Sequence, residues 1–202
     1  MTSRDAWPWG LLLIGVLGLP SVRRVLEAAM VTHMLVQIPL LAAAGALLAL
    51  YFGPRVRRRL EAIGADGWPG MLVVWFASSY WMLPRALDAA LTSPAVELAK
   101  FCSLPLLVGL PLALSWPRLG AVGRGFVLAN AISMLGVIGW LYREAPVRLC
   151  NYYLIDQQVL LGNALLTLAL LLGLACAVRA FTGPLRASAS MHETYTSDAA
   201  NP

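Results

Sequence analysis

One histidine of this chain lies within an apolar segment, and methionines flank it. His33 follows Met30 by three residues and directly precedes Met34, in the run Met30-Val-Thr-His33-Met34-Leu-Val-Gln37. On a helix Met30 and His33 share a face, while Met34 lies on the stripe of Met30. Imidazole together with soft thioether sulfur suits Cu(I). The run therefore predicts a copper site with His33 as the principal ligand.

Two further residues, Met82 and Cys102, lie at a comparable predicted depth and are candidates to complete the coordination. The predicted ligands are thus His33, Met30, Met34, Met82 and Cys102. The alternative is that the methionines are ordinary packing residues and that His33 hydrogen-bonds a neighbouring helix. A His/Met haem is a weaker alternative for the same residues. These alternatives stay open at the level of the sequence.

The composition predicts an all-α, polytopic membrane protein. Of the 202 residues 59% are hydrophobic and only 12% are charged, and the formal net charge is +5. Because most arginines lie in short loops between apolar runs, this charge indicates membrane topology rather than nucleic-acid binding. About six transmembrane helices are predicted, at 7–22, 25–52, 68–91, 95–116, 123–142 and 154–179. They form one bundle over 1–180, followed by a polar tail over 181–202 that is predicted to be disordered.

The arginines also predict the orientation. They concentrate after the second segment, at Arg55 and from Arg57 to Arg59, and basic loops stay in the cytoplasm. With six spans, both termini lie on the cytoplasmic side of a bacterial inner membrane. The segment 7–22 is predicted to be a short span rather than a cleaved signal peptide, because no A-x-A site follows it.

This topology collects polar residues at one depth. His33 lies about 12 Å below the outer surface at 1.5 Å per residue, and three other segments place polar or sulfur groups nearby. The predicted layer contains Gln37, Arg85, Asp88, Glu97, Cys150, Asn151, Asp156 and Gln157. The alternative is that the charged residues reach the headgroups and pair locally, Arg85 with Asp88 and Glu97 with Lys100.

Three stretches also carry a family resemblance. They are His33-Met34-x-x-Gln37 before Pro39-Leu40-Leu41, Leu83-Pro84-Arg85-Ala86-Leu87-Asp88 with Glu97 and Phe101 after it, and Asp156-Gln157-Gln158 before Gly162. In this order and over residues 30 to 165, the chain resembles the CtaG-type cytochrome c oxidase assembly factors. The resemblance implies a multi-span bacterial membrane protein that assists maturation of a copper-containing oxidase.

The chain departs from the family pattern at three points. Gln37 stands where the family tends to have a second histidine, Leu98 and Ala99 stand where histidines are expected beside Glu97, and the chain is short for the family. We therefore expect weaker copper binding, ligands borrowed from methionine or cysteine, or a scaffold that binds no metal.

The function predicted from the sequence is an assembly factor for a haem-copper oxidase, not an enzyme. Copper is the expected cofactor, and the expected partners are the lipid bilayer and an oxidase subunit or copper chaperone, with no nucleic acid. The first alternative is an accessory subunit of a membrane complex that holds no metal. The second is a small transporter using Glu97 and Asp156, although no inverted repeat supports it.

Overall fold

The computed structural model describes residues 7–51 and 66–199, with side chains as far as Thr182. This part of the chain is mostly helical and contains no strand. The elements are α1 (Trp7–Gly18), α2 (Pro20–Glu27), α3 (Met30–Thr32), the π-helix η2 (His33–Gln37), α4 (Ile38–Leu48), the 3-10 turn η3 (Ala49–Tyr51), α6 (Trp68–Trp81), α7 (Pro84–Thr92), α8 (Pro94–Ser103), the π-helix η4 (Leu104–Gly109), α9 (Leu110–Ser115), the 3-10 turn η5 (Trp116–Arg118), α10 (Ala121–Glu144) and α11 (Ile155–Ala199).

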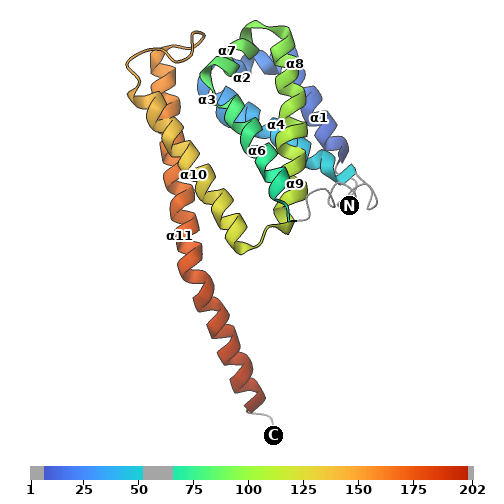
Figure 1. Cartoon of the computed structure of the whole chain (residues 1–202), viewed down its shortest axis with the longest axis vertical. Coiled ribbons are helices and arrows are strands. Elements are labelled where there is room, and N and C mark those ends of the chain that lie inside the picture. Colours follow the sequence, from blue (N-terminus) through green and yellow to red (C-terminus); the bar gives the residue numbers. More distant parts are fainter. Residues whose placement is uncertain (1–6, 52–65, 200–202) are drawn as a thin grey trace.

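The long helices alternate in direction between two ends of a bundle. Figure 1 shows α1, α6 and α10 running toward the end where α2, α3 and α7 lie, and α4, α8 with α9, and α11 running away from it. We call this the α2–α7 end. The termini of the described chain, the end of α4 and the start of α6 lie toward the opposite end. This alternation agrees with the up-and-down arrangement expected from the sequence.

Four helical stretches are long and apolar enough to cross a membrane: Met30–Tyr51, Pro94–Arg118, Ala121–Glu144 and Ile155–Thr182. A fifth is obtained if α1 and α2, which meet at a bend of 71°, count as one broken span. The number six is therefore not confirmed. The predicted segment 68–91 forms two helices instead of one, and the 14 residues of α6 reach about 21 Å, less than the roughly 30 Å of hydrocarbon.

Proline explains the two breaks that the hydrophobic runs do not reveal. Pro20 and Pro84 are each the first residue of a helix, α2 and α7 respectively. The residue before proline avoids helical backbone angles, and Leu19 and Leu83 are both extended. A run of apolar residues thus changes direction although its composition stays that of a single span.

Proline also accompanies the two π-helical segments. Each of them, η2 and η4, ends two residues before a proline, at Pro39 and Pro111 respectively. Proline has no N–H for the helical ladder and its ring crowds the carbonyl four residues earlier, and a π-turn relieves that conflict. In η2 the N–H of Ile38 accordingly bonds to the carbonyl of His33, five residues back.

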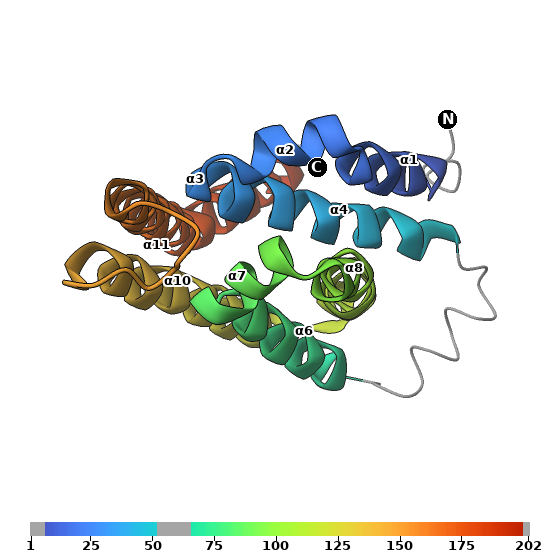
Figure 2. The ribbon, with the colours of Figure 1, turned by 90° about the horizontal axis from the view of Figure 1, so that it is seen from above.

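The core of the bundle is a row of closely packed helices: α1, α4, the α8–η4–α9 helix, and α6. In Figure 2 α8 is viewed end-on and lies between α4 and α6. Two glycines permit the closest approach: Gly45 of α4 meets the backbone of Pro105, and Gly109 of η4 meets the backbone of Ala42. A Cβ atom at either glycine would overlap the facing backbone.

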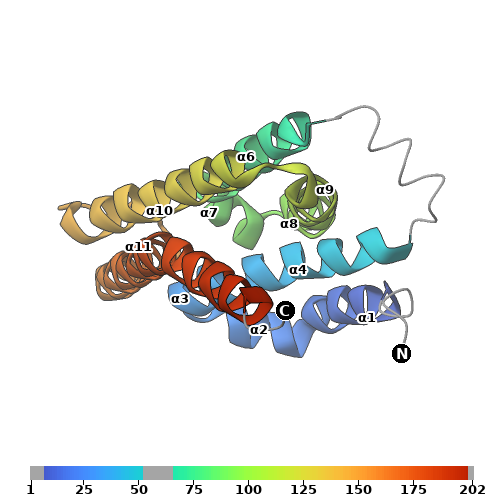
Figure 3. The ribbon, with the colours of Figure 1, turned by 90° about the horizontal axis from the view of Figure 1, so that it is seen from below.

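The two long helices outside the row, α10 and α11, form an antiparallel hairpin beside it (Figure 3). Gly139 and Gly162 face each other in it, and a Cβ on Gly162 would lie 2.7 Å from the Gly139 carbonyl oxygen. The helix α11 continues to Ala199 and has no break at residue 180. The boundary between bundle and tail that the sequence predicts, at residues 180 and 181, therefore lies within a helix. The helix that begins in the apolar residues of α11 continues into the polar residues after them.

Candidate functional site

A buried lysine is the centre of a hydrogen-bonded cluster at the α2–α7 end. Lys100, His33 and Gln37 are all 0% exposed. The Lys100 ammonium donates to Glu27 Oε1 at 2.9 Å, to His33 Nε2 at 3.1 Å and to Gln37 Oε1 at 3.2 Å. An ammonium has three hydrogens, so each has an acceptor. Together with Tyr153, described next, we call these residues the Lys100 cluster.

The hydrogen bonds define the state of His33. Tyr153 donates its single hydroxyl hydrogen to the Glu27 carbonyl oxygen at 2.8 Å. The same hydroxyl, 3.0 Å from His33 Nδ1, must therefore accept from that nitrogen. With Nδ1 carrying the hydrogen, Nε2 of a neutral imidazole is an acceptor, as the Lys100 ammonium requires. Both ring nitrogens are engaged.

Helix geometry brings these groups to one point. The π-turn η2 widens the helix so that His33 and Gln37, at its two ends, both contact Lys100 of α8. Glu27 ends α2 just before the chain turns into α3, and its carboxylate oxygen also accepts from Gln37 Nε2 at 3.2 Å. The cluster thus joins α2, η2 and α8.

A second pair of charges extends the cluster outward. Arg23 pairs with Glu97, and its Nε lies 3.4 Å from Glu27 Oε2. Glu27 and Glu97 are nearly buried, with side chains 12% and 14% exposed. Two cations, Arg23 and Lys100, thus face two carboxylates. The arrangement is neutral overall, as buried charges require.

The loop 145–154 and the start of α11 close the cluster from the side of the hairpin. Besides Tyr153, Gln157 accepts a 3.4 Å hydrogen bond from the Met30 N–H, which begins α3. The carboxylate of Asp88 in α7 accepts the Asn151 N–H at 2.7 Å. Gln158 holds the loop in place by accepting the Leu149 N–H at 2.8 Å and donating to the Tyr142 carbonyl at 3.1 Å.

Several of the predicted layer residues are therefore brought to this end. Gln37 is part of the cluster and Glu97 is next to it. Asp88 of α7 binds Asn151 of the loop, and Gln157 of α11 binds the first N–H of α3. Arg85 and Asp156 are exposed. The local pairs Arg85–Asp88 and Glu97–Lys100 do not form: Asp88 binds backbone N–H groups, and Glu97 pairs with Arg23.

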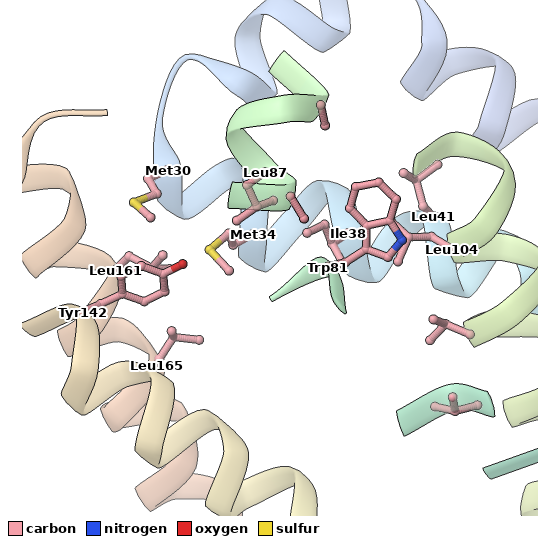
Figure 4. Close-up of a cluster of buried hydrophobic side chains, with 14 of the residues drawn as sticks. Met30, Met34, Ile38, Leu41, Trp81, Leu87, Leu104, Tyr142, Leu161 and Leu165 are labelled. Carbon is pink, nitrogen blue, oxygen red and sulfur yellow. The ribbon is translucent and has the colours of Figure 1, made fainter. Parts of the chain in front are cut away.

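The sulfur residues of the predicted copper site are dispersed. Met30 and Met34 are buried in the apolar core, and Figure 4 shows them beside Leu87, Tyr142 and Leu161. Met82 is partly buried against the same core. Cys102 is exposed and lines a separate cavity of about 460 Å³, together with Arg23, Glu97 and Phe101.

Cys150 is buried in the loop, and its thiol lies 3.9 Å from the Pro84 carbonyl oxygen. Burial, and next the carboxylate of Asp88, raise the pKa of this thiol to about 12. The thiol is therefore protonated at neutral pH, which disfavours it as a metal ligand because metals bind the thiolate.

Copper at His33 is not accommodated by this arrangement. The Nε2 lone pair that a metal would use accepts from Lys100, and the Nδ1 hydrogen is donated to Tyr153. Among residues 7–51 and 66–199 no group of three His, Cys, Asp or Glu side chains is placed to hold a metal ion. Copper binding stays a prediction, and it requires Lys100 to move away from His33.

Only weak signals in the sequence point to three members of the network. Arg23 stands before the second apolar segment and Glu27 is the third residue of it, so both resemble ordinary headgroup-level charges. Tyr153 directly follows Tyr152 in the run Cys150-Asn151-Tyr152-Tyr153, and the sequence does not show which of the two tyrosine hydroxyls joins the network. The available signal was the absence of a local charge partner for His33, because a carboxylate near a helix end can supply one.

Comparison with protein-family models, with curated proteins and with solved structures found no match to this chain.

Proposed function

We propose that this protein is an integral membrane assembly factor for a haem-copper cytochrome c oxidase. One observation carries the proposal: the three stretches that resemble the CtaG-type family meet at the same end of the bundle. His33 and Gln37 come from the first, Asp88 and Glu97 from the second, and Gln157 from the third. Residues more than a hundred positions apart are thus joined, which supports a shared role.

We place this end on the extracytoplasmic side of a bacterial inner membrane, with both termini in the cytoplasm. The support is the basic run after the second apolar segment, because α4 ends toward the opposite end of the bundle and basic loops stay inside. An oxidase subunit or copper chaperone would then meet the protein at the α2–α7 end. The role is non-catalytic.

Two forms of this proposal differ in the metal. In the copper-linked form, His33 binds Cu(I) after Lys100 is displaced. In the alternative, the chain is an accessory or scaffold protein that holds no metal, and the closed Lys100 cluster favours this form. Every hydrogen of the Lys100 ammonium and both nitrogens of His33 already have partners.

The assembly role is tested by deleting the gene and measuring the haem absorbance and activity of the terminal oxidase in membranes. Loss of assembled oxidase, restored by the wild-type chain, is expected. Normal oxidase in the deletion strain contradicts the role.

The metal is tested separately on purified protein in detergent, loaded with Cu(I) under reducing conditions. Wild type is compared with His33→Ala and Met34→Ala. Copper retained by wild type and lost in His33→Ala supports the copper-linked form. Equal stoichiometry in all three proteins removes His33 as a ligand.

A further inference from the structure

The Lys100 ammonium occupies the position that a metal ion would take. Three acceptors from two elements, α2 and η2, converge on Nζ: the Glu27 carboxylate, the His33 imidazole nitrogen and the Gln37 carboxamide oxygen, at 2.9, 3.1 and 3.2 Å. An imidazole nitrogen and two oxygens form a familiar first coordination shell for Zn²⁺ and other divalent metals. Here the cation is covalently part of the chain.

We propose that Lys100 is a built-in cation that holds this site closed to metals, and that removing its side chain opens a metal site formed by Glu27, His33 and Gln37. The inference rests on the geometry of the cluster alone and goes beyond the proposed function, because it holds whether or not the chain assists an oxidase.

Charge supports the same assignment. The network contains two cations, the buried Lys100 and the partly exposed Arg23, and two nearly buried carboxylates, Glu27 and Glu97. Loss of Lys100 leaves one uncompensated negative charge in a buried place, which is costly until another cation arrives. A bound Cu(I) ion restores neutrality, and Zn²⁺ matches the nitrogen and oxygen donors.

The positions of the acceptors require only a small adjustment. Metal–ligand bonds to imidazole nitrogen and carboxylate oxygen are about 2.0–2.2 Å, so each acceptor must move inward by roughly 1 Å. Because Glu27 ends a helix and Gln37 ends a π-turn, their side chains can make this adjustment. His33 needs no change of tautomer, since Nε2 already presents its lone pair to the centre.

The experiment compares metal content in wild type, Lys100→Ala and Lys100→Ala/His33→Ala, each purified in detergent. Zn²⁺ and Cu(I) are offered separately, and bound metal is measured after desalting. We expect near-equimolar metal in Lys100→Ala with at least one of the two ions, and only background in wild type and in the double variant. Arg23→Gln is the matched control: it removes a positive charge from the same network without vacating the position at His33, so it should bind no metal.

Equal uptake by wild type and Lys100→Ala overturns the proposal, as does a folded Lys100→Ala protein that takes up neither ion. If Lys100→Ala folds poorly, its yield of monodisperse protein is compared with and without Zn²⁺ during expression. A yield that rises with Zn²⁺, and only while His33 is present, supports the site. A yield that does not respond overturns it. Neither result depends on the oxidase phenotype, so failure of this inference and failure of the assembly role are distinguishable.

Discussion

At the scale of single residues, the state of His33 depends on a tyrosine from the far end of the sequence. The Tyr153 hydroxyl links the His33 ring to the main chain at Glu27. Because the hydroxyl donates its hydrogen to the Glu27 carbonyl, it accepts a hydrogen from Nδ1 of the ring. The other nitrogen, Nε2, is then the acceptor for Lys100.

We therefore expect Tyr153→Phe to destabilise the folded protein by about 1–3 kcal/mol, since the Glu27 carbonyl and His33 Nδ1 lose their partner in a buried place. Thermal unfolding in detergent measures the change. Tyr152→Phe is the control, because Tyr152 is 60% exposed and should leave stability unchanged. A Tyr153→Phe protein as stable as the control contradicts a stabilising role for this hydroxyl.

The second residue-scale prediction concerns Cys150. Its pKa is raised to about 12 from an ordinary 9.0, and the folded state therefore binds the thiol proton more tightly than the unfolded state. The stability that this burial contributes is fully present below about pH 9 and declines as the pH rises toward about 12. At neutral pH we expect maleimide to label the exposed Cys102 and to spare Cys150 until the protein unfolds. Mass spectrometry of labelled peptides checks this, and rapid labelling of Cys150 in the folded protein contradicts it.

Sequence reasoning identified some members of the network and missed others for a physical reason. A histidine or glutamine inside an apolar run is conspicuous because burial is costly there, so His33 and Gln37 were predicted. Glu27 and Arg23 stand at a helix end, where a charge normally reaches water. Their burial follows from tertiary packing, since α2 lies beside α8. No local sequence pattern predicts that packing.

At the scale of elements, glycine and proline determine how the helices pack. The sequence predicted helices correctly over the apolar segments, but a hydrophobic run carries no signal for the bend between α1 and α2 or the break between α6 and α7. The prolines at these points gave the available signal. The π-turns were missed because hydropathy does not depend on the hydrogen-bond register.

The crossing of α4 and η4 yields an element-scale prediction. Gly109→Ala should push the two helices apart, since its Cβ would overlap the Ala42 carbonyl, at a cost of about 1–3 kcal/mol for overpacking. Gly136→Ala in α10 is the matched control, because a Cβ there meets nothing within 4 Å. Thermal unfolding of both variants in the same detergent provides the measurement. Equal stability would falsify the close crossing.

At the scale of the whole molecule, the alternating helix directions determine the membrane sides. A fluorescent-protein fusion at the C-terminus should be fluorescent, and an alkaline phosphatase fusion within the loop 145–154 should be active, because that loop lies at the α2–α7 end and the C-terminus at the other. An active phosphatase at the C-terminus would show that the assigned orientation is inverted.

The loop 145–154 and the start of α11 are synthesised more than a hundred residues after His33, yet they supply the hydroxyl that completes the bonding of His33 and the carboxamide that covers the first N–H of α3. A nascent chain that stops before Tyr153 therefore lacks the partner of His33 Nδ1. Closure of this side of the Lys100 cluster must wait until the polypeptide has been elongated through the start of α11.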